Sequence, residues 1–299
     1  MDKMIVIPSG NNKIYGMLHL PQNFSTEKVP VIVICHGFIS NKIGQHQIFV
    51  KAARNFCDNG YAVFRFDYPG CGESTGEHKN ITLFNQVRET IKVLNFLTTE
   101  PLLDTDNIIL LGHSFGGCVA SLVAGQAKQV KSLILWSPVA NPLEDIVGIV
   151  GRELWRQSLD GKSAIYQGFE LGREFFLSLS QMSPLEKIKD FNGNVLIIHG
   201  SEDVDTPVIN AKFYECSLEE RLRGTQKINI ITGADHTYSS PVWETEAIRL
   251  TANWLNEGQY NYDRSVFNLG ESGTAKINNK IMSKGLSDTL TLCFSGDNM

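Results

Sequence analysis

The sequence predicts an α/β fold in which a mostly parallel sheet of eight strands is flanked by helices. Short apolar runs alternate with helical patterns between about residues 29 and 256, as in chains built from strand–helix–strand units. Several of these runs are apolar without interruption, which is typical of strands buried on both faces of a parallel sheet. The chain has 299 residues, of which 42% are hydrophobic, and is therefore long enough to bury a large core.

The first two expected strands form a hairpin. Residues 3–8 and 13–20 flank the sequence Ser9-Gly10-Asn11-Asn12, and glycine and asparagine favour the positive φ angles of tight hairpin turns. The other six strands are expected at residues 31–35, 61–66, 108–111, 133–136, 195–198 and 228–231. The last of these has the weakest apolar pattern.

Helices are expected between the strands, at residues 46–58, 83–97, 116–127 and 241–256. In the first two, apolar residues recur at spacings of three or four and therefore lie on one face. Pro241 suits the first turn of the last helix, where a backbone N–H would have no partner within the helix. Helices placed in this way return the chain for a further parallel strand.

Two stretches interrupt this alternation. Residues 140–190 are apolar and helical in pattern where a short connection would suffice, and they predict a small helical cap inserted into a single domain of residues 1–257. The aromatic residues of the cap are expected to pack it together, so that it borders an apolar pocket. Residues 258–299 are rich in Gly, Ser and Asn and are expected to form a C-terminal extension of unknown role, in which residues 289–294 have a strand-like pattern.

Composition and charge argue against several classes of function. The 27 Lys and Arg and 32 Asp and Glu residues give a net charge of −5, which does not suit a broad surface for nucleic acid or anionic lipid. No apolar run reaches the roughly 20 residues of a membrane span, and the apolar start is too short for a signal peptide, so a cytoplasmic protein is expected. The six cysteines form no C-x-x-C pair and no phosphate-loop or H-E-x-x-H motif occurs, so neither a cofactor nor a metal is expected.

The segment Gly112-His113-Ser114-Phe115-Gly116-Gly117 carries the strongest indication of chemistry. It is a G-x-S-x-G sequence that directly follows an expected strand and precedes a helix of small residues, which is the context of a nucleophile elbow. Such a turn strains the serine backbone and raises the hydroxyl above the sheet, near a helix N-terminus that favours negative charge. The segment therefore predicts Ser114 as a nucleophile; the alternative is a tight turn with a capping serine.

A serine nucleophile needs a base, and the base needs an acid that orients it. His236 follows the last expected strand, and an acidic cluster of Glu202, Asp203 and Asp205 follows the strand before it. Both segments lie at the carboxyl ends of parallel strands, where open α/β sheets build their sites. His236 is therefore expected to be the base, the alternative being a solvated loop histidine, and Asp235 beside it is expected to bond its own loop.

Two backbone N–H groups are expected to stabilise an oxyanion. One is the amide of Phe115, directly after the nucleophile. The other is the amide of Phe38, because the sequence His36-Gly37-Phe38 follows the strand at residues 31–35 and Gly37 lets the backbone turn there. His36 precedes Ser114 in the chain and is expected to support this turn rather than to act as the base.

Together these motifs resemble the α/β-hydrolase family. The resemblance covers roughly residues 3–257, and it is carried by residues 36–38, 67–74, 112–117, 199–203 and the loop of His236. In this family the acid usually lies four residues after the histidine of an H-G-x-x-D pattern, which implies Asp203 here. The segment from Ser183 to Gly200 is similar to the cinnamoyl (feruloyl) esterase-like branch, although serine peptidase-like and monoacylglycerol lipase-like branches share much of it. Thr206-Pro207 stands where the family often has V-P.

The resemblance implies a serine hydrolase that cleaves carboxylic esters of short, medium or aromatic acyl groups through an acyl-enzyme. A thioesterase, an amidase or peptidase, and an acyltransferase would use the same residues, and a small-molecule receptor would use the same fold without catalysis. The expected partner is a small acyl substrate, and a homodimer is left open.

Overall fold

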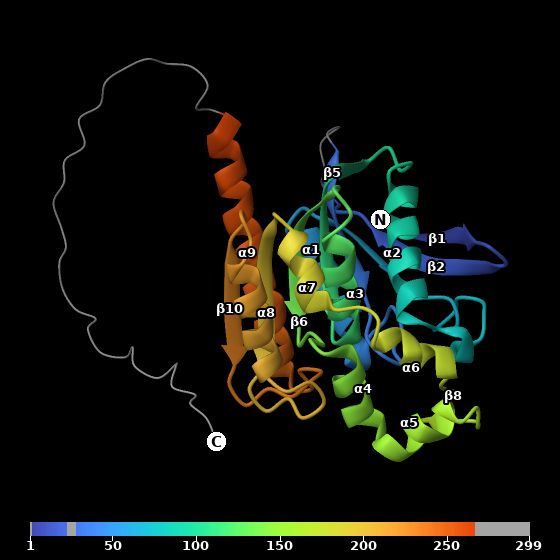
Figure 1. Ribbon diagram of the computed structural model, residues 1–299. Coiled ribbons are helices and arrows are strands. Elements are labelled where there is room, and N and C mark those ends of the chain that lie inside the picture. Colours follow the sequence, from blue (N-terminus) through green and yellow to red (C-terminus); the bar gives the residue numbers. More distant parts are fainter. Residues whose placement is uncertain (1, 23–27, 267–299) are drawn as a thin grey trace, which may run out of the picture. The chain divides into compact units, whose positions relative to one another are not determined.

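The computed structural model describes residues 2–22 and 28–266, and it contains the expected sheet of eight strands (Figure 1). The strands, in chain order, are β1 (Asp2–Ser9), β2 (Asn12–His19), β3 (Val29–Cys35), β4 (Ala62–Phe66), β5 (Leu103–His113), β6 (Val130–Trp136), β9 (Asn194–Gly200) and β10 (Gln226–Ile231). Their order across the sheet is β1-β2-β4-β3-β5-β6-β9-β10. β1 pairs antiparallel with β2 and β2 with β4, whereas all other pairs are parallel. The predicted fold class is therefore confirmed.

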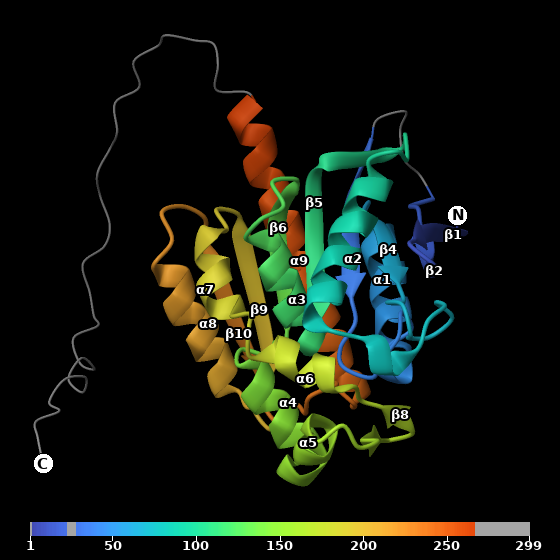
Figure 2. The same ribbon diagram turned by 45° about the vertical axis from the view of Figure 1, so that its right-hand side comes forward.

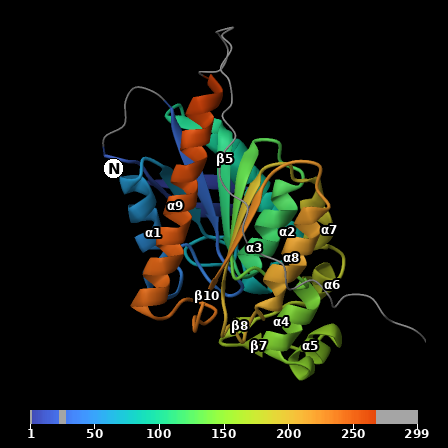
Figure 3. The same cartoon turned by 90° about the vertical axis from the view of Figure 1, so that its left-hand side faces the viewer.

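Two layers of helices bury the two faces of the sheet, as Figure 3 shows with the sheet seen nearly edge-on. One face is covered by α1 (Ile48–Asp58) and by residues 241–255 of α9 (Pro241–Val266), and the other by α2 (Leu83–Leu97), α3 (Phe115–Ala124) and α8 (Ile209–Glu219). In β3, Ile32 and Ile34 join the core on the α1 side, whereas Val31 and Val33 join the core on the α2 side. This two-sided burial explains why the strand is apolar at every position.

Residues 140–179 form three helices and a small hairpin at the carboxyl ends of the parallel strands, and a fourth helix at residues 184–187 lies beside α3 and α8 (Figure 2). These elements are α4 (Pro142–Val150), α5 (Arg152–Leu159), β7 (Ile165–Tyr166), β8 (Phe169–Glu170), α6 (Arg173–Leu179) and α7 (Pro184–Lys187). Short 3₁₀ turns occur at Gln45–Gln47, His78–Asn80 and Ile188–Asp190. We call residues 140–190 the cap, and their separation as a structural unit stays a prediction.

Helix α8 is absent from the predicted elements. Its buried side chains include the polar residues Asn210 and Ser217, while Ile209 and Phe213 are exposed, so the apolar residues do not mark one face. Helix α3 ends at Ala124, three residues earlier than expected. The strand-like segment at residues 289–294 and most of the predicted extension lie outside the described residues.

The part of the chain up to Gln259 forms one compact unit. No helix within the described ranges is both long enough and apolar enough to cross a membrane.

Candidate active site

Ser114 lies in a sharp turn between strand β5 and helix α3. Its backbone has φ 58° and ψ −123°, a conformation that L-residues rarely adopt and that must be held by its surroundings. The turn also brings two backbones very close together, because a Cβ on Gly116 would collide with the carbonyl oxygens of Cys35 and His36. The glycine of the elbow is therefore required by the approach of α3 to the end of β3.

This close approach predicts a large loss of stability for Gly116→Ala. We expect the free energy of unfolding to fall by about 1–3 kcal/mol or more, because the added methyl group forces backbone atoms apart. Urea unfolding measures the change. Gly148→Ala in α4 is the matched control, since its Cβ would have open space and a helical alanine is favoured over glycine by about 0.5–1 kcal/mol. Equal unfolding midpoints for the two variants would contradict the prediction.

The side chains of Ser114, His236 and Asp203 lie in one hydrogen-bonded chain. The distance from Ser114 Oγ to His236 Nε2 is 2.8 Å, and the distance from His236 Nδ1 to Asp203 Oδ2 is also 2.8 Å. Ser114 is buried, the Asp203 side chain is fully buried, and 12% of the His236 side chain is exposed. With its proton on Nδ1, His236 donates to Asp203 and can accept the Ser114 hydroxyl proton at Nε2.

Asp203 is the member of the acidic cluster that reaches His236, while Glu202 and Asp205 are exposed. Its second oxygen, Oδ1, accepts hydrogen bonds from the amides of Thr206 (2.7 Å) and Asp205 (3.1 Å). Burial acts to raise the pKa of Asp203, but hydrogen bonds from histidine side chains and from the Thr206 amide outweigh it and hold the pKa well below its usual range. The carboxylate is therefore ionised at neutral pH and fixed in orientation.

The loops that carry Asp203 and His236 are joined by their backbones. The amide of Ser201 donates to Ile231 O at 3.0 Å, and the amide of Glu202 donates to Ala234 O at 3.0 Å. Asp235 bonds its own loop, as the sequence predicted: its Oδ1 accepts from the amides of Thr237 and Ser239 at 3.2 and 2.9 Å. The spacing between the acid and the base is thus set by main-chain contacts.

Two further histidines contact the hydrogen-bonded residues Ser114, His236 and Asp203, and the sequence analysis assigned neither of them a role. His113 Nε2 lies 3.0 Å from His236 O, and burial together with the nearby charge of His236 lowers the pKa of His113 to about 3. His113 is therefore neutral at pH 7 and donates through Nε2–H to the His236 backbone. His199 Nε2 lies 2.8 Å from Thr206 O and 3.2 Å from Asp203 Oδ2. The sequence contains one indication of their place: His113 belongs to the motif of the elbow, and His199 belongs to the motif of the acidic loop.

The loop after β3 lies directly against Ser114. A Cβ on Gly37 would be 3.1 Å from Ser114 Cβ and 3.5 Å from its Oγ. His36 supports the loop, as expected, because its Nδ1–H donates to Gly37 O at 2.9 Å and its Nε2 accepts from the Tyr68 amide at 3.3 Å. In the part of the chain that the structure describes, the amide of Phe38 in this loop makes no backbone hydrogen bond.

Aromatic rings of the cap contact the residues on both sides of the expected oxyanion site. The Phe38 ring is stacked on Phe175 of α6, with centroids 5.5 Å apart, and on Tyr166 of β7, with centroids 6.2 Å apart. Phe175 also meets the ring of Phe115 edge-on at 5.8 Å. The region next to Ser114 is therefore walled by aromatic side chains.

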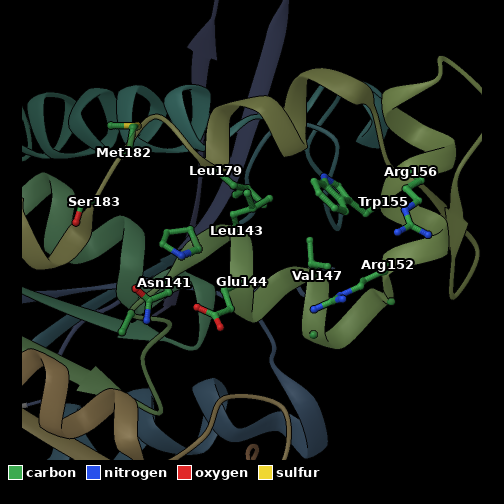
Figure 4. A pocket seen from close by; sticks show the side chains of 14 residues that line it. Asn141, Leu143, Glu144, Val147, Arg152, Trp155, Arg156, Leu179, Met182 and Ser183 are labelled. Atoms are coloured by element: carbon green, nitrogen blue, oxygen red, sulfur yellow. The ribbon is translucent and has the colours of Figure 1, made fainter. Parts of the chain in front are cut away.

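The cap also contains a separate cavity of about 850 Å³, shown in Figure 4. Helices α4 and α5 and the segment after α6 line it, with the side chains of Trp155, Leu143 and Leu179 gathered around it and Glu144 and Arg152 on its polar side. Ser114, Asp203 and His236 are not among the lining residues. Asp145 of α4 is turned inward, where it accepts hydrogen bonds from the amides of Ala140 and Asn141 and from Asn210.

Comparisons with known proteins agree with this architecture. The family model of the alpha/beta hydrolase fold matches residues 30–161. The chain is 34% identical over 107 residues, 36% of each chain, to an uncharacterized 31.7 kDa protein of the traX-finO intergenic region of Escherichia coli. It is 34% identical over 139 residues to the hydrolase LUC6 of Fusarium sp., with 44% of this chain and 32% of the relative covered. The chain thus matches about a third of the length of these relatives.

Among solved structures, Est1E from Butyrivibrio proteoclasticus, determined with bound ferulic acid, is similar with a TM-score of 0.72 at 22% identity. This similarity covers 86% of the present chain and 98% of Est1E. The family match, the order of the eight strands and the likeness to this structure together show that the chain has the α/β-hydrolase fold.

Proposed function

We propose that this protein is a serine hydrolase that cleaves carboxylic esters through a covalent acyl-enzyme. The observation that carries the proposal is the hydrogen-bonded chain from Ser114 Oγ through His236 to Asp203, with 2.8 Å at each contact. A strained serine at the end of a strand, a base within hydrogen-bond distance and a buried carboxylate behind the base form the arrangement that activates a hydroxyl nucleophile.

In the proposed reaction, His236 Nε2 takes the Ser114 proton as Oγ attacks the ester carbonyl. The amides of Phe38 and Phe115 stabilise the oxyanion of the tetrahedral intermediate, and the Asp203 carboxylate stabilises the protonated His236. His236 then gives its proton to the leaving alkoxide, which departs as the alcohol and leaves Ser114 acylated. A water molecule, deprotonated by His236, attacks the acyl carbonyl; the bond from Ser114 Oγ to the acyl group then breaks, His236 returns its proton to Oγ, and the carboxylic acid is released. These steps use only groups of the chain and water.

The aromatic surroundings favour an apolar acyl group of small or medium size, including an aromatic one. The rings of Phe38, Tyr166 and Phe175 stack on one another next to the loop that lies against Ser114, and flat apolar groups pack well against such rings. The chain is similar in fold to Est1E, whose structure was determined with bound ferulic acid, an aromatic acid. The second candidate function is transfer of the acyl group from Ser114 to a thiol, amine or alcohol in place of water. The hydrogen-bonded residues Ser114, His236 and Asp203 would serve all of these reactions equally.

A screen of p-nitrophenyl and alkyl esters that varies the acyl chain and the leaving group tests the proposal. We expect hydrolysis of apolar acyl esters, with release of the free acid, and covalent labelling of Ser114 by a fluorophosphonate. Preferential transfer of the acyl group to an added alcohol or amine would indicate the acyltransferase. Absence of both ester cleavage and Ser114 labelling would contradict the proposal and favour the small-molecule receptor.

Tyr166→Ala is expected to lower kcat by about 3- to 10-fold with a small change in KM. The Phe38 ring then loses one of its two stacking partners, so the proposed oxyanion amide is held less firmly; complete loss of such a donor costs about 2.7–4 kcal/mol. Steady-state kinetics on one ester measures the effect. Tyr166→Phe, which keeps the ring, and Ile165→Ala at the exposed neighbouring position should both retain the wild-type kcat. A Tyr166→Ala enzyme with unchanged kcat would show that the cap does not hold this amide.

A further inference from the structure

We propose that His199 is a positioning residue that donates a second side-chain hydrogen bond to Asp203 and so fixes the carboxylate that orients His236. This inference rests on the proposed function, in which Asp203 acts through His236.

The geometry brings two histidines to one carboxylate oxygen. Asp203 Oδ2 is 2.8 Å from His236 Nδ1 and 3.2 Å from His199 Nε2. His199 Nε2 is also 2.8 Å from Thr206 O. Two acceptors face one nitrogen, so the hydrogen of the neutral ring lies on Nε2 and is shared between them.

The surroundings of His199 leave its Nε2–H directed at Asp203 and shielded from water. The side chains of His199 and Asp203 are both 0% exposed, so water does not reach the contact. His199 Nδ1 is buried without a hydrogen-bond partner in the described residues, which is the state expected of the unprotonated nitrogen. A buried histidine with one nitrogen unpaired is costly to keep, and its remaining nitrogen is directed at the acid of the proposed triad.

Four donors then surround the Asp203 carboxylate: the amides of Thr206 and Asp205 at Oδ1, and His236 and His199 at Oδ2. The backbone donors prevent rotation of the Asp203 carboxyl group. His199 adds a second side-chain donor at Oδ2, so the negative charge there is stabilised by two histidines and not by His236 alone. Because His199 Nε2 contacts both Thr206 O and Asp203 Oδ2, it also links two positions of the acidic loop to each other.

The other titratable groups near Asp203 are His236, His113 and Tyr238. Burial lowers the pKa of His113 to about 3, and burial also raises the pKa of Tyr238 well above its usual range, so both are neutral at pH 7. Neither His113 nor Tyr238 therefore contributes to a change in the pH profile between pH 5 and 9.

Three substitutions separate donation from packing. In His199→Gln the side-chain amide nitrogen takes the place of Nε2 and can donate to Asp203, whereas in His199→Asn the amide nitrogen takes the place of Nδ1 and falls short. His199→Leu fills a similar volume without any donor. Circular dichroism and thermal unfolding establish which variants are folded.

We expect His199→Asn and His199→Leu to lower kcat about 10- to 100-fold with KM changed by less than about 2-fold, and His199→Gln to recover most of the loss; a factor of 10 corresponds to about 1.4 kcal/mol. The acid limb of the kcat/KM profile should move to higher pH in the Asn and Leu variants, because a carboxylate that has lost a donor stabilises the protonated base more strongly. Titration of the Asp203 carboxyl carbon by NMR should show a raised pKa in the same two variants and not in the Gln variant.

Folded Asn or Leu variants with wild-type kcat, pH profile and Asp203 titration would overturn the inference, as would a Gln variant no better than the Asn variant. If the Asn and Leu variants do not fold, a Gln variant that raises the Asp203 pKa and shifts the acid limb overturns it equally. The NMR titration needs no activity. A wild-type protein that cleaves no ester and is not labelled at Ser114 refutes the proposed function, whereas an active wild type with insensitive His199 variants refutes only the positioning role.

Discussion

Ser114→Ala is expected to lower kcat for a p-nitrophenyl ester by about four to six orders of magnitude. The substitution removes Oγ, the atom that forms the acyl bond, while the backbone donors of Phe38 and Phe115 remain. Removal of the nucleophile from a complete triad costs about 10⁶-fold in kcat, and the residual rate comes from binding and oxyanion stabilisation alone. Steady-state rates with wild type and variant at equal concentration, together with fluorophosphonate labelling, measure the effect.

Ser180→Ala is the control for this experiment, because Ser180 is an exposed serine at the end of α6 whose hydroxyl donates to Leu177 O of its own helix. It should retain the wild-type rate and the label. An undiminished rate in Ser114→Ala would exclude Ser114 as the nucleophile, and labelling at another serine would identify the residue that acts in its place.

Asp203→Asn is expected to lower kcat by about 10⁴-fold. The asparagine amide presents N–H to His236 Nδ1, which must then accept, so the histidine proton moves to Nε2 and the Ser114 proton has no acceptor. The substitution keeps the shape of the side chain, and the oxygen that accepts from the Thr206 and Asp205 amides remains. Because the pKa of Asp203 is held well below its usual range, the loss should be equally large throughout pH 5–8.

Glu202→Gln and Asp205→Asn are the matched controls, since both remove one carboxylate from exposed positions of the same loop. Both should keep the wild-type kcat and the wild-type pH profile. A large effect at Asp205 and none at Asp203 would contradict the prediction. The acid would then be Asp205, although Asp203 is the residue that contacts His236.

The core of the fold was predictable from local patterns. A strand buried on both faces is apolar at every position, and β3 shows why: its alternate residues enter two different cores. The β1–β2 hairpin was equally visible, because only certain residues suit its turn, and Gly10 has the positive φ of 59°. Helix α8 was not visible, because it is held partly by polar contacts such as Asn210 to Asp145, which leave no apolar period in the sequence.

The candidate site likewise has one part that local sequence predicted and one part that it did not. Ser114 and His236 were predicted from a glycine-bounded turn and from chain order, and the structure brings their side chains within 2.8 Å of each other. The residues alone left three acids open after β9, and the preference for Asp203 came from the family pattern. The contact with His236 depends on hydrogen bonds between two loops that are distant in the chain, and no local pattern encodes such bonds.

By itself, the sequence determined the α/β fold class, the strand-to-helix turn at Ser114 and the position of the histidine and the acids at strand ends. These features follow from burial periodicity and from the backbone freedom of glycine, which act over a few neighbouring residues. Only the tertiary structure decided which acid meets His236, that His113 and His199 join the same network, and that cap rings hold Phe38. Those contacts arise between segments that packing alone brings together, so their partners can be identified only once the chain is folded.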